Sequence, residues 1–233
     1  MNKETLSIIL ALGLIIVSIF AIFQFSDSEE RVLNTIGSYS SNVAPDTVKI
    51  DFSIISFSDS AVESQNSNRE LMNNVFSSLK AAGLSDDEIK TIDFRTDINR
   101  IWDGNKYLDS GFQTINSIRI NTKKIDKAGE FIDIASSNGV NNINNLRFVL
   151  SDEKREEVFQ NALASAGKNA RDRADVLAKS IGFKVKGIKS INIEGDNPIY
   201  FAKSFSVESL DSTPISPGNL DVDVRVSVSF IIN

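Results

Sequence analysis

The stretch VKIDFSIISFS, Val48–Ser58, predicts how the first half of this chain folds. Apolar and polar residues alternate along it, so that two sets point to opposite sides: Val48, Ile50, Phe52 and Ile54 against Lys49, Asp51 and Ser53. Successive side chains of a β-strand point to opposite faces of its sheet. The alternation therefore predicts a half-buried strand. The segment VLNTIGSYS is an earlier strand candidate, and a break at Ala44-Pro45-Asp46 separates the two.

A helix and a hairpin are expected after this strand. The predicted helix, Ala61–Ala82, ends at Gly83, a residue type common just past helix ends. Its apolar residues recur at helical spacing and predict a core face: Leu71, Met72, Val75, Phe76 and Leu79. Two strand candidates follow, TIDFRTDINRIW and FQTINSIRI, and Asp103-Gly104 between them fits a hairpin turn.

The second half repeats this order. The strand LRFVL precedes a long helix from Ser151-Asp152 to about Ile181, and the strands VKGIKSINIEG and LDVDVRVSVSFII follow. Alanines recur every fourth residue and predict a ridge for close packing: Ala162, Ala166, Ala170, Ala174 and Ala178. At about 1.5 Å per residue the helix would be longer than one small sheet can cover, so we expect a free end that suits a partner subunit. The predicted fold class is α+β, with two β-α-β-β units sharing one core, mainly antiparallel strands and helices on one side.

The stretch NGVNNINNLRF, residues 138–148, contains five asparagines. It follows a short predicted helix, Ile125–Ser137. These amides could surround a ligand, or they could be chosen for backbone shape. Asparagine and glycine accept left-handed backbone conformations, so Asn138-Gly139 is well placed to end the helix. We interpret the stretch as a connector.

The N-terminal residues are strongly apolar. Leu6–Phe25 carries no charge, and about 20 apolar residues match the hydrocarbon thickness of a bilayer. The run is longer than a typical signal-peptide core, and no small-residue cleavage pattern follows it. We expect residues 1–25 to be a retained single-pass membrane anchor, residues 26–31 a linker, and residues 32–233 a domain outside the cytoplasm.

Composition narrows the possible functions. The net charge is −6, which argues against a nucleic-acid partner. The sequence has neither histidine nor cysteine. This excludes imidazole bases, thiol nucleophiles, disulfides and the commonest transition-metal ligands. We expect no enzyme activity, no cofactor, and no catalytic, cofactor-binding or metal-binding residue. The alternative is a small-ligand or calcium-binding protein, or an enzyme using carboxylates, for which Asp93, Asp97 and Asp103 are the best candidates.

The order of landmarks resembles the SIMPL-domain family over about 200 residues. The matching residues run along the whole chain after the linker: Gly37, Pro45-Asp46, Asn68, Met72, Val75, Leu79, Gly83, Gly111-Phe112, Asn116, Asp133, Ala135, Asn138-Gly139-Val140-Asn141, Phe148, Ser151-Asp152, Ala162, Pro214-Ile215 and Pro217-Gly218. The resemblance implies a membrane-linked or secreted domain that forms oligomers and, for some members, takes part in oxidative-stress defence. It implies no catalytic mechanism. We expect a membrane-tethered module that forms homo-oligomers or binds another protein.

Overall fold

The computed structural model describes residues 30–202, 215 and 217–233, without the side chains of residues 195–202. The predicted anchor, residues 1–25, lies outside the described residues, as does most of the predicted linker. The chain divides into two compact units. We call residues 38–167 and 194–225 the central unit, and residues 30–37, 168–193 and 226–233 the terminal unit. Within the described residues, no helix is both long and apolar enough to cross a membrane.

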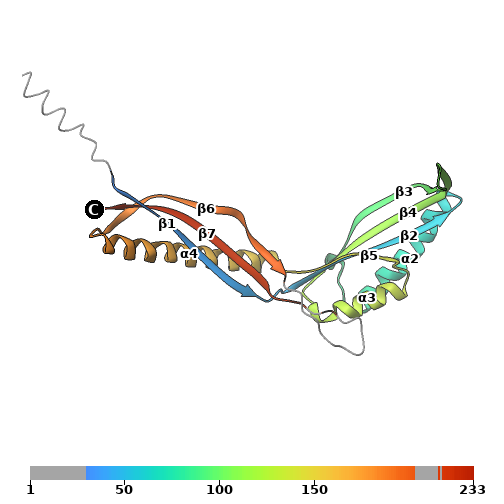
Figure 1. Ribbon diagram of the computed structural model, residues 1–233. Helices are drawn as coiled ribbons and strands as arrows, with labels where there is room; N and C mark the ends of the chain where they lie inside the picture. Colours follow the sequence, from blue (N-terminus) through green and yellow to red (C-terminus); the bar gives the residue numbers. More distant parts are fainter. Residues whose placement is uncertain (1–29, 203–214, 216) are drawn as a thin grey trace, which may run out of the picture. The chain divides into compact units, whose positions relative to one another are not determined.

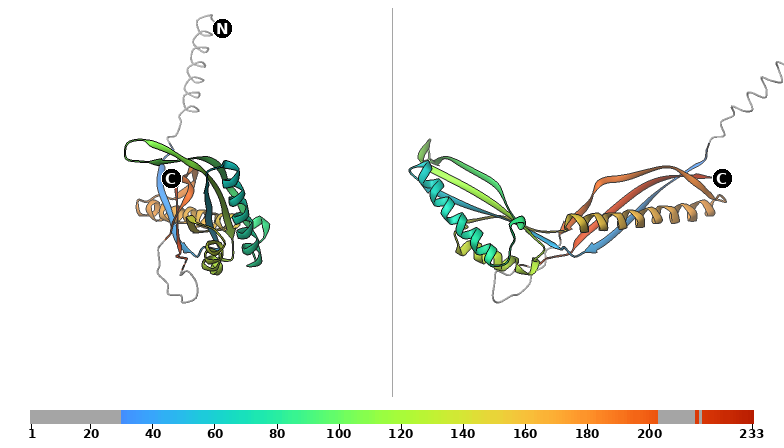
Figure 2. Two further views of the ribbon diagram at one scale, coloured as in Figure 1. Left: turned by 90° about the vertical axis from the view of Figure 1, so that its right-hand side faces the viewer. Right: turned by 180° about the vertical axis from the view of Figure 1, so that it is seen from behind.

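The central unit contains a four-stranded sheet (Figure 1). Its strands are β2 (Thr47–Ser58), β3 (Ile89–Trp102), β4 (Tyr107–Thr122) and β5 (Asn142–Val149). The spatial order is β3-β4-β2-β5, and every neighbouring pair is antiparallel. Helices α2 (Ala61–Ala81) and α3 (Ala128–Ser137) cover one face of this sheet (Figure 2), with α2 packed on β2 and β4.

The predicted core face of β2 is confirmed. Val48, Ile50, Phe52 and Ile54 have no exposed surface, and Met72, Val75 and Leu79 of α2 pack against them. Burying each such side chain contributes roughly 1.5–3 kcal/mol. The opposite face differs from the prediction, because Asp51 and Ser53 are buried too. Polar neighbours on β4 and β5 cover them, so β2 is buried on both faces.

Asn68 joins α2 to the sheet beneath it. Its side chain is fully buried, and its Nδ2 donates to the backbone carbonyls of Ile54 at 2.9 Å and Thr114 at 3.2 Å. One amide therefore bonds to both β2 and β4. At its other end the helix stops where predicted, since Gly83 has a φ of +104° and its N–H donates to the carbonyl of Lys80 at 2.9 Å.

The terminal unit contains parts of the strands that form a second sheet. This sheet has the order β1-β7-β6, formed by β1 (Val32–Val43), β6 (Val185–Ala202) and β7 (Leu220–Ile232). Helix α4 (Asp152–Ser180) runs along it (Figure 1). The alternation of β7 is confirmed, with buried residues at every second position from Leu220 to Ile232. The five predicted ridge alanines of α4 have no exposed surface, so the ridge is covered over its length.

The predicted duplication is correct in element order, and the strands pair across the two halves. Both halves read β-α-β-β, as β2-α2-β3-β4 and β5-α4-β6-β7. However, β5 pairs with β2 of the first half, while β1 pairs with β7 in the second sheet. The prediction of one core shared by both repeats is wrong in part. Leu146 and Phe148 of β5 pack against the main buried cluster, but within the described residues the other elements of the second repeat do not contribute to it. The main buried cluster contains residues of the central unit, without the buried alanines of α4 or the buried face of β7.

Candidate functional site

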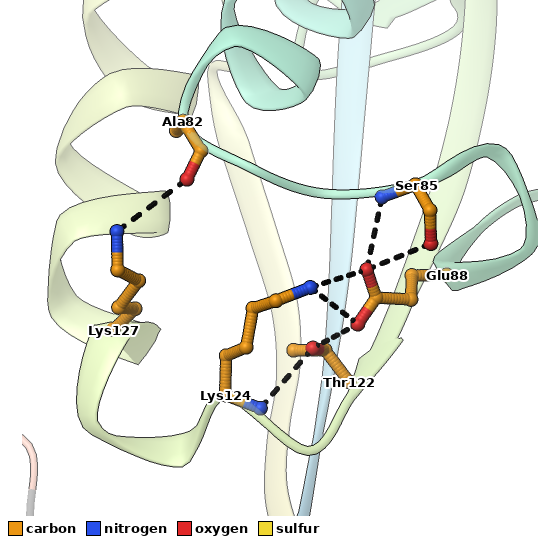
Figure 3. Close-up of polar contacts among 6 residues, drawn as sticks. All are labelled: Ala82, Ser85, Glu88, Thr122, Lys124 and Lys127. Atoms are coloured by element: carbon orange, nitrogen blue, oxygen red, sulfur yellow. Dashed lines mark hydrogen bonds and ion pairs between the residues drawn. The ribbon is translucent and has the colours of Figure 1, made fainter.

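A partly buried carboxylate lies at one end of the central sheet (Figure 3). Glu88 closes a short 3-10 helix, η1 (Asp86–Glu88), that follows α2. Its carboxylate accepts hydrogen bonds from the backbone N–H and the hydroxyl of Ser85, both at 2.9 Å. Thr122, at the end of β4, donates a further bond. Lys124 Nζ lies 2.7 and 3.0 Å from the two carboxylate oxygens.

These contacts keep Glu88 ionised. Burial alone would raise its pKa, but the bonds from Lys124, Thr122 and Ser85 outweigh burial and lower the pKa to about 2. A carboxylate that is such a weak base removes protons poorly near neutral pH. Glu88 therefore holds together the loop after α2, the end of β4 and the segment leading into the 3-10 helix η2 (Ile125–Lys127).

A second carboxylate, Asp46, performs a similar role nearby. It lies in the break before β2 and accepts bonds from the backbone N–H and the hydroxyl of Ser151, both at 2.6 Å. Burial raises its pKa, and the Ser151 and Thr47 bonds lower it further than burial raises it. Asp46 thus fixes the loop after β5 to the start of β2. Pro45-Asp46 and Ser151 both belong to the resemblance described above.

A polar cleft of about 540 Å³ is lined by Glu88 and by Ser151, the residue that Asp46 binds. The lining is almost entirely polar, and its charged members carry both signs: Lys49, Lys123, Lys124, Asp87, Glu88, Asp152 and Glu153. Glu153 faces Lys123 at 3.7 Å, and its backbone N–H bond is the first cause that lowers its pKa. This cleft can hold a small polar molecule, and the pKa values of three of its carboxyl groups are lowered: Asp87, Glu88 and Glu153.

The sequence did not indicate Glu88 or Asp46 as site residues. The pattern Ser85-x-x-Glu88 is a capping box, and the structure contains both of its bonds. The spacing of Ser85 and Glu88 can be recognised in the sequence. The contact with Lys124 joins residues 36 positions apart, and no local pattern predicts it.

The three predicted acidic candidates do not form one cluster. Asp93 and Asp97 both lie beside Arg95 of the same strand, with 3.5 Å between Arg95 Nε and an Asp97 oxygen. Asp103 lies in the hairpin turn, where Oδ1 accepts the backbone N–H groups of Asn105 and Lys106 at 2.9 Å each. Those two bonds lower its pKa. Among the described residues, no three acidic side chains gather as a metal site would require.

The asparagine stretch is a connector only at its start. Asn138-Gly139 ends α3, whereas residues from Asn142 onward belong to β5 and pair with β2, so the prediction is wrong for that part. Gly139 has a φ of +118°, and Asn138 Nδ2 donates to the carbonyl of Ile134 at 2.8 Å. The Asn141 amide bonds to both backbone groups of Ile55, at 2.7 and 2.9 Å, and so extends the edge of β2 as a strand would. Asn144 donates to the hydroxyl of Ser53 at 2.6 Å.

The sheet face opposite the helices carries an ion pair that the sequence did not reveal. Arg119 donates two bonds to Asp51, at 2.6 and 2.7 Å, from the neighbouring strand. The Arg119 bond is the first cause that lowers the pKa of Asp51. Ser53 and Ser117 bond across the same two strands at 2.7 Å. These contacts set the register of β2 and β4.

The fold is that of an α+β protein with antiparallel sheets. Its partly buried carboxylates bond to other side chains of the same chain, as Glu88 does to Lys124 and Asp51 does to Arg119. The family model that matches the chain is SIMPL, described as "Protein of unknown function (DUF541)", and it covers residues 33–230. The chain belongs to this family, as the sequence resemblance predicted.

Two relatives share most of the chain. Both are called "26 kDa periplasmic immunogenic protein", one from Brucella abortus and the other from Brucella melitensis. The first is 24% identical over 203 residues and the second 23% identical over 201 residues. Each match covers 81% of this chain and 80% of the relative.

Proposed function

We propose that this protein is a non-enzymatic module for self-assembly or protein binding, held outside the cytoplasm by its N-terminal segment. The relatives described as periplasmic support the location outside the cytoplasm. The uncharged run Leu6–Phe25 supports a tether that remains attached. The family resemblance supports a role for such a module in protection of the cell envelope, including protection against oxidative stress.

Exposed apolar side chains on the β3–β4 hairpin carry this proposal. We call them the apolar hairpin surface: Ile98, Ile101, Trp102, Tyr107 and Leu108. Each is at least 43% exposed, and Tyr107 reaches 68%. The rings of Trp102 and Tyr107 lie 5.1 Å apart. Ile101 and Leu108 lie opposite each other on one face of the hairpin, and Trp102 and Tyr107 lie opposite each other on the other face. Both faces therefore expose apolar area that a protein contact would cover.

The carboxylates support the non-enzymatic part of the proposal. An enzyme without histidine or cysteine needs a carboxylate, lysine or hydroxyl whose pKa is tuned toward the working pH. In the described residues, the carboxyl groups with a shifted pKa all shift downward, through hydrogen bonds and lysine or arginine contacts. This direction suits structural ion pairs.

The test measures the mass of the full chain, purified in detergent, by light scattering with the detergent contribution subtracted. A module that self-assembles gives a multiple of the chain mass of 25.6 kDa. Trp102→Lys should shift the distribution toward the monomer, whereas Asn105→Lys adds the same charge at the exposed hairpin turn and should leave it unchanged. A wild-type chain that stays monomeric at high concentration removes the assembly part of the proposal.

Protein binding needs its own test. Chemical crosslinking of the tethered chain in cells, followed by mass spectrometry, should capture the same partners from wild type and Asn105→Lys. Trp102→Lys should capture fewer. Equal capture by both variants would mean that the apolar hairpin surface does not bind the partner.

A small-ligand or calcium-binding function, or a carboxylate enzyme, is the alternative proposal. The polar cleft beside Glu88 favours it, because the cleft has room for a small molecule and presents lysines as well as carboxylates. The triple variant D93N/D97N/D103N tests calcium binding at the hairpin. If calcium raises the melting temperature of the wild type but not of this variant, the hairpin binding site is supported. Loss of a calcium effect in Glu153→Gln would instead support the cleft.

A further inference from the structure

Strand β3 leaves one edge of the central sheet open. It is the first strand in the order β3-β4-β2-β5, and the part of the chain that the structure describes places no strand on its outer side. The strand is 14 residues long and exposed at most positions. A long open edge presents a row of backbone donors and acceptors that can pair with another strand.

The two faces of β3 carry different chemistry. Thr96 points toward the helices, because its hydroxyl bonds to Gln65 of α2 and to Thr114 at 3.0 Å each. Phe94 and Ile98 share this face by alternation and are 56% and 43% exposed. The other face carries Asp93, Arg95 and Asp97, whose side chains are 39%, 53% and 55% exposed.

We infer that β3 pairs in antiparallel fashion with β3 of a second copy of this chain. In this pairing Thr96 lies opposite Thr96 of the other copy, across a two-fold axis. This inference rests on the self-assembly proposed above and adds the edge of β3 as a second contact between copies, next to the apolar hairpin surface, with Ile98 belonging to both. A two-fold axis perpendicular to a sheet brings the same edge of both copies together. It also keeps each sheet face on its own side, so residues opposite one another must share a face.

This face rule limits the possible registers. The axis must therefore pass midway between one residue and the same residue of the other copy, which we call an axis through that residue. An axis at any other position would place side chains from opposite sheet faces opposite each other. The longest regular stretch of β3 lies between two register shifts, one before Asp93 and one after Ile98. We therefore centre the pairing within residues 93–98, where the ladder can be longest.

The charges select among these centres. An axis through Arg95 places Arg95 opposite itself and Asp93 opposite Asp97, so like charges meet. An axis through Asp93 or Asp97 places that carboxylate opposite itself. Like charges directly opposite each other destabilise a strand pair, which excludes these three registers. An axis through Ile98 leaves only that residue paired within the regular stretch.

Two centres bring opposite charges together. An axis through Phe94 pairs Asp93 with Arg95, but it leaves only three residues within the regular stretch. An axis through Thr96 pairs Arg95 with Asp97 twice on one face and Phe94 with Ile98 twice on the other. It uses five consecutive regular residues, so it satisfies charge, apolar contact and ladder together.

The absence of cysteine from the chain allows a direct test with single-cysteine variants. Thr96→Cys places two thiols opposite each other, and paired Cα atoms of antiparallel strands lie about 4.5–5.5 Å apart, within disulfide range. Mild oxidation of the full chain in detergent should convert most of Thr96→Cys to a crosslinked dimer. Phe94→Cys should give little dimer, because the two thiols would lie about four residues apart along the strands, roughly 13 Å.

The crosslinking result separates this inference from the broader proposal. Chains that assemble by light scattering but crosslink at residue 94, or at neither position, overturn the Thr96 register and leave self-assembly standing. Chains that remain monomeric overturn both. Light scattering is measured on the wild type, so a folding defect of Thr96→Cys does not affect that part.

A charge exchange tests the register without cysteine. Arg95→Asp should place like charges opposite each other and lower the dimer fraction at a fixed concentration at least several-fold. The double variant R95D/D97R restores two opposite-charge pairs in the Thr96 register and should recover the dimer. In the Phe94 register the same double variant places the new carboxylate at position 95 opposite Asp93, so failure to recover would overturn the inference.

Discussion

Replacing Glu88 by glutamine removes the charge of the carboxylate that bonds to Ser85, Thr122 and Lys124, and it keeps the shape of the side chain. The folded-state pKa of about 2 compares with an ordinary value of 4.5. A difference of about 2.5 in pKa, at about 1.4 kcal/mol for each whole number, corresponds to roughly 3.5 kcal/mol. Lys124 is 42% exposed, and water screens its contact with Glu88. We therefore expect Glu88→Gln to lower the free energy of unfolding at pH 7 by about 1–2 kcal/mol.

The pH dependence gives a sharper test than the single value. The pKa of Glu88 is lower in the folded state, so the unfolded chain binds a proton more readily as the pH falls. The stabilisation is complete above pH 4.5 and is lost as the pH falls toward about 2. The difference in stability between wild type and Glu88→Gln should therefore shrink across this window and nearly disappear at its acid end.

Urea unfolding of the full chain in detergent measures both quantities. Fluorescence follows Trp102, the single tryptophan, which belongs to the same sheet as Thr122. Glu130→Gln is the matched control, because it removes an exposed carboxylate whose contact with Lys127 is a surface pair, and it should change stability by less than about 0.5 kcal/mol. Equal stabilities of wild type and Glu88→Gln from pH 7 to pH 3 would refute the structural role of Glu88.

Three further substitutions test packing, each by thermal unfolding of the full chain. Asn68→Ala leaves two strand carbonyls without their donor in a fully buried position and should cost about 2–4 kcal/mol; a change below about 0.5 kcal/mol would contradict the bridging role. Ala170→Leu forces a larger side chain into the buried ridge and should cost about 1–3 kcal/mol, whereas exposed Ala164→Leu should be nearly neutral; similar effects would show that the ridge has room. Gly111→Ala, at a φ of +73°, would place a Cβ 2.5 Å from the carbonyl oxygen of Ser58 and should cost at least about 1–3 kcal/mol; unchanged stability would show that the backbone relaxes there.

The sequence predicted the elements of the fold better than their partners. β2, the stop of α2 at Gly83 and the alanine ridge of α4 are set by neighbouring residues, so alternation and helical spacing were sufficient. The sheet that receives β5 depends on contacts such as Asn144 with Ser53, which lie 91 positions apart. A short strand with mixed burial fits either sheet by pattern alone. The pairing of β5 with the first repeat, and of β1 with the second, was therefore not predictable from local signals.

The candidate site shows the same division between local and distant information. Ser85-x-x-Glu88 could be recognised from its spacing, but that spacing indicates only the beginning of a helix. The structure adds Thr122 and Lys124, and these partners turn a helix cap into a junction of three segments. The absence of histidine and cysteine directed the search to carboxylates. It could not distinguish a carboxylate that reacts from one that is bonded.

The direction of the pKa shifts bears on that distinction. Burial without partners raises the pKa of a carboxyl group toward neutral pH and prepares it for proton transfer. In Glu88 and Asp46 burial acts in that direction, but hydrogen bonds and, at Glu88, a lysine reverse the outcome. A protein that uses its partly buried carboxylates to join loops can present its exposed surface to partners. On β3 the exposed surface is an open strand edge. Asp93, Arg95 and Asp97 alternate in charge along it, which disfavours pairing registers in which like charges lie opposite each other. The argument for an assembly module therefore depends on the edge of β3 more than on the polar cleft.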